Sequence, residues 1–502
     1  MPSESASINI LYFSACAIEM KTAIGHARKI YENCRSKNPT AAILVTILAA
    51  TAILSLLMAI ITYGHSFENM LYSYRDSYWD DFFDSIYFSY EDPYTVSKVL
   101  YPPLITIAYS ALADFLIPRV QGYTPYDPNW TDHRDLYSNV LRDSPIGATT
   151  YILLTVVAVA ALIILSVRIL RSKGYGLNPW IIAVLIAASY PFVFAVDRGN
   201  SIIYAAVLSL FFVYGYKSPN GRIRFASYLC IALAASIKVY PAVLLVLLIR
   251  ERRWKDFAVS ATMVLVLLTV PFVFTDGTPL ILLDTMLNHA HTTAGSNGLV
   301  NINDWINLIF GPFVSDGTEK AISFGITALF EFFLLWRIVF DTRLREWEML
   351  LLASSMFIFG PGVGAAYLLT FAAIPLLWFI SDKGESRKCT VLLAVGFAVV
   401  FCLFPWFDGL RHLQTSVRAT VLLLMTLFVA SGGPRIMEKT LDRRRDASEC
   451  KGSAGNHAER SCNTRLSAAA FLMPSHAFGR LSHEIMARTA MSARDLRNGS
   501  GG

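Results

Sequence analysis

Carboxylates set among aromatic side chains are the most chemically suggestive feature of this sequence. Residues 76–86 read DSYWDDFFDSI, and Asp92-Pro93-Tyr94 and Tyr101-Pro102-Pro103-Leu104 follow within twenty residues. Burial among rings at a membrane surface raises the pKa of a carboxyl group, which suits it to act as a general base near neutral pH. A solvated acidic loop beside an aromatic belt has the same composition. Composition alone leaves both interpretations open.

The elements that must position these residues are transmembrane helices. Of the 502 residues, 54% are hydrophobic and only 16% are charged, whereas a soluble domain carries roughly 25% charge. Apolar runs such as Ala41 to Thr62 are too long for the strands of a membrane barrel. The net charge of +6 comes from short basic clusters between apolar runs, a pattern typical of orientation signals. We therefore predict an all-α polytopic membrane protein that does not bind nucleic acid.

The basic clusters predict how the chain is threaded. Residues 1–39 are basic and are expected in the cytoplasm, whereas the acidic stretch from Tyr63 to Pro145 is expected outside, with a juxtamembrane helix at Leu100 to Leu116. A second external loop is predicted at 275–320, and a disordered basic cytoplasmic tail at 436–502. The transmembrane domain at 40–435 then has about twelve crossings and both termini inside. The predicted spans are 41–62, 146–170, 179–196, 201–216, 257–274, 321–337, 347–362, 364–381, 389–405 and 417–433, with a broken hairpin near 225–250.

The broken hairpin is predicted because two basic clusters flank one short apolar interval. Both flanks belong in the cytoplasm, and Pro241 favours a turn at Lys238-Val239-Tyr240-Pro241. Lys238 is then an ionisable group at intermediate depth, where it needs a partner such as a lipid phosphate, or else snorkels to a headgroup. Arg198 is expected outside, at the start of a helix. It can clamp the same phosphate, or it can be neutralised by the adjacent Asp197.

The order of these motifs resembles glycosyltransferase family 87, membrane enzymes of the GT-C superfamily that use polyprenyl-phosphate sugars. The resemblance covers roughly residues 40–435 and rests on DFF at 81–83, DPY at 92–94, YPPL at 101–104, RGN at 198–200, KVYP at 238–241 and RRW at 252–254. It implies a GT-C fold with juxtamembrane helices in a large first external loop. Asn200 departs from the pattern, because such enzymes usually show Gln after the Arg-Gly.

The resemblance also implies an activity and roles for particular residues. A single sugar, mannose in the first instance, would pass with inversion from a polyprenyl-phosphate donor to a glycan or glycolipid acceptor on the external face of the cell membrane, without a cofactor or metal. Asp81 falls on the family's general base. Asp80 is its rival, or tunes it by repulsion between adjacent carboxylates. Lys238 and Arg198 would bind the donor phosphate. The alternative for either aspartate is to cap a helix beginning at Phe82.

Residues of the second external loop are candidates for sugar or acceptor binding. His289 or His291 could hydrogen-bond the sugar or the leaving phosphate, and Trp305, like Tyr101 in the first loop, could stack on a sugar face. Loop packing explains them equally well. The His-x-His spacing lacks a third ligand at a recognisable position, so we predict no metal site. For Glu331 and Tyr367, packing is the default interpretation.

Two other classes of protein share some of these features. A transporter or lipid flippase also has about a dozen spans with charges inside the membrane, but it often shows paired broken helices from an internal repeat. This sequence shows one Lys-bearing hairpin without a counterpart, and its long external loops favour an enzyme. A noncatalytic scaffold would tolerate any change at Asp81.

Overall fold

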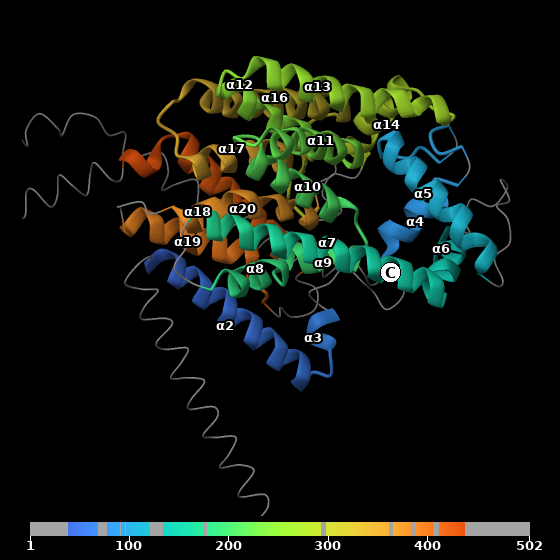
Figure 1. The fold of residues 1–502 in the computed structure, drawn as a ribbon, viewed down its shortest axis with the longest axis horizontal. Helices are drawn as coiled ribbons and strands as arrows, with labels where there is room; N and C mark the ends of the chain where they lie inside the picture. Colours follow the sequence, from blue (N-terminus) through green and yellow to red (C-terminus); the bar gives the residue numbers. More distant parts are fainter. Residues whose placement is uncertain are drawn as a thin grey trace, which may run out of the picture. The chain divides into compact units, whose positions relative to one another are not determined.

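A computed structural model shows a helical protein (Figure 1), and the residues it describes contain no strand. These residues are 39–68, 78–90, 92–95, 97–120, 134–173, 178–292, 298–360, 365–382, 387–404 and 411–436. One compact unit ends at Pro434. The predicted basic tail lies almost wholly outside the described residues.

The main helical elements follow one another in this order along the described residues. They are α2 (Pro39–Ile61), α4 (Asp80–Phe88), α5 (Pro103–Leu116), α6 (Arg134–Asp143), α7 (Pro145–Ser172), α8 (Pro179–Ala187), α9 (Tyr190–Arg198), α10 (Ile202–Gly215), α11 (Gly221–Ile237), η2 (Tyr240–Leu245), α12 (Val246–Arg250), α13 (Trp254–Thr269), α14 (Pro279–Thr292), α15 (Ile302–Phe310), α16 (Asp316–Phe340), α17 (Glu346–Phe359), η4 (Ala366–Ala372) and α20 (Arg411–Ala430).

Several helices are long and apolar enough to cross a bilayer, so the protein is a membrane protein. Within the described ranges there are five such helices: α2, α7, α13 with its 3-10 extension, α16 and α20. The pair α8 and α9 makes a sixth if it counts as one span bent by 47°. The break lies at Ala188-Ser189, just before Pro191, because a proline has no N–H with which to continue the hydrogen bonding of the preceding helix. The other apolar helices of the described ranges have only 10–17 residues. The number of about twelve crossings therefore remains a prediction.

The broken hairpin is confirmed as a path of the chain. Helix α11 ends at Ile237, Lys238 has an extended backbone, and η2 and α12 follow. The two flanks meet, because Lys217 Nζ lies 2.8 Å from Glu251 Oε1 and Arg253 donates to the carbonyl of Tyr216. The chain therefore returns to the end from which α11 started.

A network of ion pairs joins four turns that the charge pattern assigns to one side of the membrane. Lys173, just after α7, lies 2.7 Å from Glu346 at the start of α17, and Lys217, after α10, lies 3.8 Å from the same carboxylate. Lys217 also pairs with Glu251 after α12. These turns therefore share one end of the bundle, as the threading requires.

The first predicted external loop folds into short helices that pack on one another. Phe82, Phe83 and Ile86 form one buried face of α4 and meet Tyr109 and Leu116 of α5. Helix α6 also packs against α4 and leads into α7 (Figure 1). The helix predicted at 100–116 is present, and it begins at Pro103, a residue type favoured at the first turn.

Two helices in the second half of the chain begin earlier than the predicted spans. Helix α16 begins at Asp316 rather than near 321, and helix α20 begins at Arg411 rather than near 417. The predicted second external loop at 275–320 contains the helices α14 and α15. Hydropathy marks only the part of a helix that suits lipid, whereas backbone hydrogen bonding continues into polar sequence.

Candidate functional site

The start of α4 packs directly against the end of α9. The Trp79 backbone N–H donates to the Asp197 carbonyl at 2.7 Å, and Trp79 itself adopts a left-handed conformation with φ of 61°. Gly199 ends α9 with φ of 71°, and a Cβ there would lie 2.7 Å from the Trp79 carbonyl oxygen. Glycine is required on both counts, because other residues are strained at this φ and no space exists for a side chain. This contact places residues 80–81 beside residues 198–200.

Asp81 is held by two residues that flank Gly199. Arg198 Nη2 lies 2.9 Å from Asp81 Oδ1, and Asn200 Nδ2 donates to Asp81 Oδ2 at 2.6 Å. The ion pair is partly exposed, at 15% for the Asp81 side chain and 19% for that of Arg198. The two carboxylate oxygens therefore face a partly exposed guanidinium group and a buried amide.

Asn200 is fixed in the orientation that donates to Asp81. Its Oδ1 accepts the backbone N–H of Ile202 at 3.0 Å, which leaves Nδ2 to face the carboxylate. A flipped amide would bring its NH₂ against a backbone donor and its oxygen against a carboxylate oxygen. Asn200 is also buried. It is thus an oriented donor next to Asp81.

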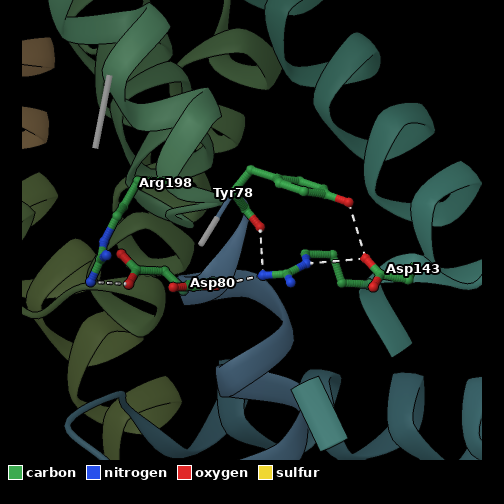
Figure 2. Close-up of polar contacts among 6 residues, drawn as sticks. Tyr78, Asp80, Asp143 and Arg198 are labelled. Atoms are coloured by element: carbon green, nitrogen blue, oxygen red, sulfur yellow. Dashed lines mark hydrogen bonds and ion pairs between the residues drawn. The ribbon is translucent and has the colours of Figure 1, made fainter. Parts of the chain in front are cut away.

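Asp80 has a separate arginine. Arg142 Nη1 lies 3.0 Å from Asp80 Oδ1, and Arg142 Nε lies 3.4 Å from Asp143, which also accepts from the Tyr78 hydroxyl at 3.0 Å. Figure 2 shows Arg198 on one side of Asp80 and the Tyr78–Asp143 pair on the other. The Arg142 side chain is only 3% exposed. The guanidinium of this second pair is therefore closed to an anionic ligand, although the Asp80 side chain is 18% exposed.

The surroundings of Asp80 favour its neutral form. Burial raises the pKa of Asp80 to about 6, and the nearby Asp84 carboxylate adds to this, while Arg142 opposes it. Asp80 therefore changes charge close to neutral pH. The predicted influence of adjacent carboxylates is consistent with this shift, although burial is its larger cause.

Lys238 lies under aromatic rings from two other parts of the chain. Its Nζ is 4.0 Å from the centre of the Tyr101 ring and 6.0 Å from that of Tyr367 in η4. Ring faces attract cations, and the interaction strengthens where water is excluded. Asp81 is near enough to act electrostatically on both Lys238 and Tyr101. One cation, one carboxylate and two phenol rings thus converge from four distant segments.

Two expectations about this region are corrected. Arg198 was expected at the start of a helix, but it is the last residue of α9, where a cation interacts favourably with the helix dipole. The helix expected to begin at Phe82 begins at Asp80, and no side chain caps it. Asp80 and Asp81 lie in its first turn, where acidic residues stabilise a helix through its dipole, but neither residue is the N-cap.

The second-loop candidates do not join this group in the contacts that are described. The backbone of α14 carries His289 and His291, whose side chains lie outside the described residues. Trp305 lies in α15, and its buried indole nitrogen has no hydrogen-bond partner among the described residues. Asn301 and Asp304 around it form a capping box at the start of α15. Binding roles for His289, His291 and Trp305 remain predictions.

Other residues gain or lose significance in the structure. Arg142 was not singled out from the sequence, although a basic residue just before a span on the acidic side was a usable signal. Tyr367, for which packing was the default, is placed beside Lys238.

Arg253, from the Arg252-Arg253-Trp254 motif, donates to Tyr228, ten residues before Lys238. Because α11 rises 1.5 Å per residue, that motif lies about 15 Å from the site.

The site combines one carboxylate with cations of two kinds. A carboxylate can accept a proton from a hydroxyl group, and nearby Arg and Lys side chains can stabilise negative charge on a departing phosphate.

A family model described as glycosyltransferase family 87 matches residues 100–361, just over half of the chain. The match includes Tyr101, Arg198 and Lys238 and begins after Asp81. No curated protein and no solved structure matches.

Proposed function

Because the chain belongs to glycosyltransferase family 87, we propose that this membrane glycosyltransferase moves one sugar from a polyprenyl-phosphate donor to a glycan or glycolipid acceptor. The first candidate for the sugar is mannose. The site is assigned to the external face of the cell membrane, because the charge pattern puts the ion-paired turns at Lys173, Lys217 and Glu251 inside. Nothing in the contacts favours the transporter alternative.

The observation that supports this proposal most is the position of Asp81. It meets Arg198 at 2.9 Å, and it is close enough to Lys238 to act on it electrostatically. A base and two cations in one place match the needs of glycosyl transfer, in which a proton is removed at one end of the reacting system and a phosphate departs at the other.

The proposed reaction is a single displacement at the anomeric carbon. Asp81 takes the proton of the acceptor hydroxyl, whose oxygen forms the new bond to the anomeric carbon. The bond from that carbon to the phosphate oxygen breaks, and the electron pair leaves with the polyprenyl phosphate. Lys238 and Arg198 offset the charge that builds on this phosphate. Attack opposite to the leaving group inverts the anomeric configuration.

A lipid-linked donor also explains why the site is built on membrane helices. Apolar side chains are exposed along α2, α7, α13 and α16, for example Ile60, Val157, Leu265 and Phe332. Such surfaces suit contact with acyl and isoprenoid chains. The isoprenoid part of a donor can therefore stay in the bilayer while its phosphosugar enters the site.

The test is transfer by purified protein from a synthetic polyprenyl-phosphate mannose to a panel of acceptors. Asp81→Asn keeps the shape of the side chain but removes the base, and general-base loss typically lowers the rate by about 10²- to 10⁴-fold. Asp80→Asn is the matched control and should retain much more activity, because Asp80 is engaged by Arg142. Thermal unfolding of both variants checks their folding. A fully active Asp81→Asn protein would overturn the assignment of the base.

A further inference from the structure

Two ion pairs lie side by side at the start of α4, and their arginines differ in accessibility. The Asp80 side chain is 18% exposed, but its partner Arg142 is only 3% exposed and also contacts Asp143 and the Tyr78 ring. In the Asp81–Arg198 pair, both side chains keep 15–19% exposure. An incoming ligand can therefore compete for Arg198 but not for Arg142.

The groups around the Asp81 carboxylate are those expected around a bound phosphate. Arg198 presents a guanidinium nitrogen at 2.9 Å, and Asn200 presents an oriented amide donor at 2.6 Å. Charge-assisted contacts of this kind suit carboxylates and phosphates equally well. Lys238 supplies a second cation nearby. Asp81 thus occupies the position of an anionic ligand.

We propose that Arg198 and Asn200 form a phosphate-binding pair that Asp81 occupies in the unliganded protein, and that the donor phosphate displaces Asp81 from it. This inference rests on the proposed function and adds Asn200 and an order of events to it. Both carboxylate oxygens of Asp81 are engaged by Arg198 and Asn200 in the unliganded protein, so they are less available to an acceptor hydroxyl. Donor binding transfers Arg198 to the phosphate and releases Asp81 to act as the base. The acceptor is then deprotonated only when a donor is present.

The architecture allows this exchange without movement of the helices. The backbone under Arg198 and Asn200 is fixed by the Trp79–Asp197 hydrogen bond and the close approach of Gly199. The Asn200 amide stays oriented through the Ile202 N–H. Only the ends of the Arg198 and Asp81 side chains need to change partners. A ligand can drive such a change as far as its affinity differs between the two arrangements.

If the phosphate displaces Asp81, removal of Asp81 should change the affinity for the phosphate, which the loss of a general base alone would not do. Removing the Asp81 carboxylate should tighten phosphate binding, because the phosphate no longer competes with an internal anion. We expect Asp81→Asn and Asp81→Ala to bind polyprenyl phosphate roughly tenfold more tightly than the unaltered protein, which corresponds to about 1.4 kcal/mol. Asp80→Asn is the matched control, since it also removes one negative charge, and it should change the affinity much less.

The experiment measures equilibrium binding of three probes to purified full-length protein: a short polyprenyl phosphate, the corresponding uncharged polyprenol, and inorganic phosphate. The affinity for the polyprenol should not depend on Asp81. Tightening with inorganic phosphate but not with the lipid would overturn the lipid donor as the competitor. Unchanged or weaker lipid binding by both Asp81 variants, or equal tightening by Asp80→Asn, would overturn the displacement.

Because this readout requires no turnover, it is separate from the transfer assay. Tightening by the Asp81 variants with no sugar transfer in any protein would support the phosphate site and refute the proposed reaction. Transfer that depends on Asp81 without tightening would support the reaction and refute the displacement. Failure of every protein to bind polyprenyl phosphate would refute both.

Discussion

Asp80 is the residue whose charge should be visible in a pH profile. Its pKa is raised to about 6, so it gains a proton as the pH falls through 6 and loses its attraction for Arg142. The negative charge beside Asp81, which favours proton transfer from the acceptor, disappears at the same time. We expect turnover to fall below pH 6 in the unaltered protein. Asp80→Asn should lack this inflection and should have lower turnover at pH 7.5; an unchanged inflection near 6 would assign it to another group.

The same raised pKa has a consequence for stability. Asp80 has an ordinary pKa near 3.9 in an unfolded chain, so between about pH 4 and 6 the folded protein binds more protons than the unfolded one. By linkage, the contribution of Asp80 to the free energy of unfolding is most favourable below pH 4 and falls as the pH rises through 6. Thermal unfolding over this range should show a smaller fall for Asp80→Asn than for the unaltered protein. Parallel curves would contradict the shift.

Lys238 should contribute to donor binding as a charge. Lys238→Met keeps an apolar side chain of similar length against the Tyr101 ring but removes the cation, and Lys238→Arg keeps both the charge and the ring contact. We expect the Met variant to bind polyprenyl phosphate roughly 10- to 100-fold more weakly, and the Arg variant to recover part of the loss. Equal affinities for all three proteins would instead favour a lysine that only stabilises the hairpin.

At the scale of elements, the contact between α4 and α9 depends on Gly199. Gly199→Ala places a Cβ against the Trp79 backbone at a φ of 71°, and backbone strain of this kind costs about 1–3 kcal/mol. The start of α4 should move, so that Asp81 loses Arg198 and Asn200, and turnover should fall at least tenfold together with thermal stability.

The matched control for this change is Gly221→Ala at the first residue of α11. A Cβ at Gly221 meets nothing within 4 Å, and its φ is not in the left-handed region. The Gly221 variant should be as active and at least as stable as the unaltered protein, because alanine restricts the unfolded chain. If Gly199→Ala behaved like this control, the close approach to Trp79 would not be what positions Asp81.

At the scale of the whole molecule, the ion-paired turns predict one cytoplasmic face. In a variant without the native cysteines, single cysteines replacing the exposed Arg222 and Lys255 should not react with an impermeant thiol reagent on intact cells, whereas one replacing the exposed Lys98 should. Permeabilised cells provide the control for reactivity. Labelling of either cytoplasmic position on intact cells would contradict the orientation, although the reversal of the chain at Lys238 would stand.

The sequence by itself determined the class of protein, the family, and which residues deserved attention. Apolar runs must form helices in lipid because no other segment satisfies its own backbone, and proline next to a lysine between basic clusters marked the hairpin. These signals are local or periodic, so they can be read along the chain. The same locality explains why the predicted spans began too late for α16 and α20, where the helices continue into polar sequence.

Only the tertiary structure decided which charges meet. Asp80 and Asp81 are adjacent in sequence, yet one pairs with Arg142 and the other with Arg198, because successive residues in the first turn of a helix point in different directions. Those partners come 62 and 117 residues later. The sequence showed Asn200 only as a departure from the family pattern. Its contact with Asp81 depends on the close packing of the start of α4 against Gly199. Contacts between distant segments arise from packing, which leaves no periodic trace in the sequence.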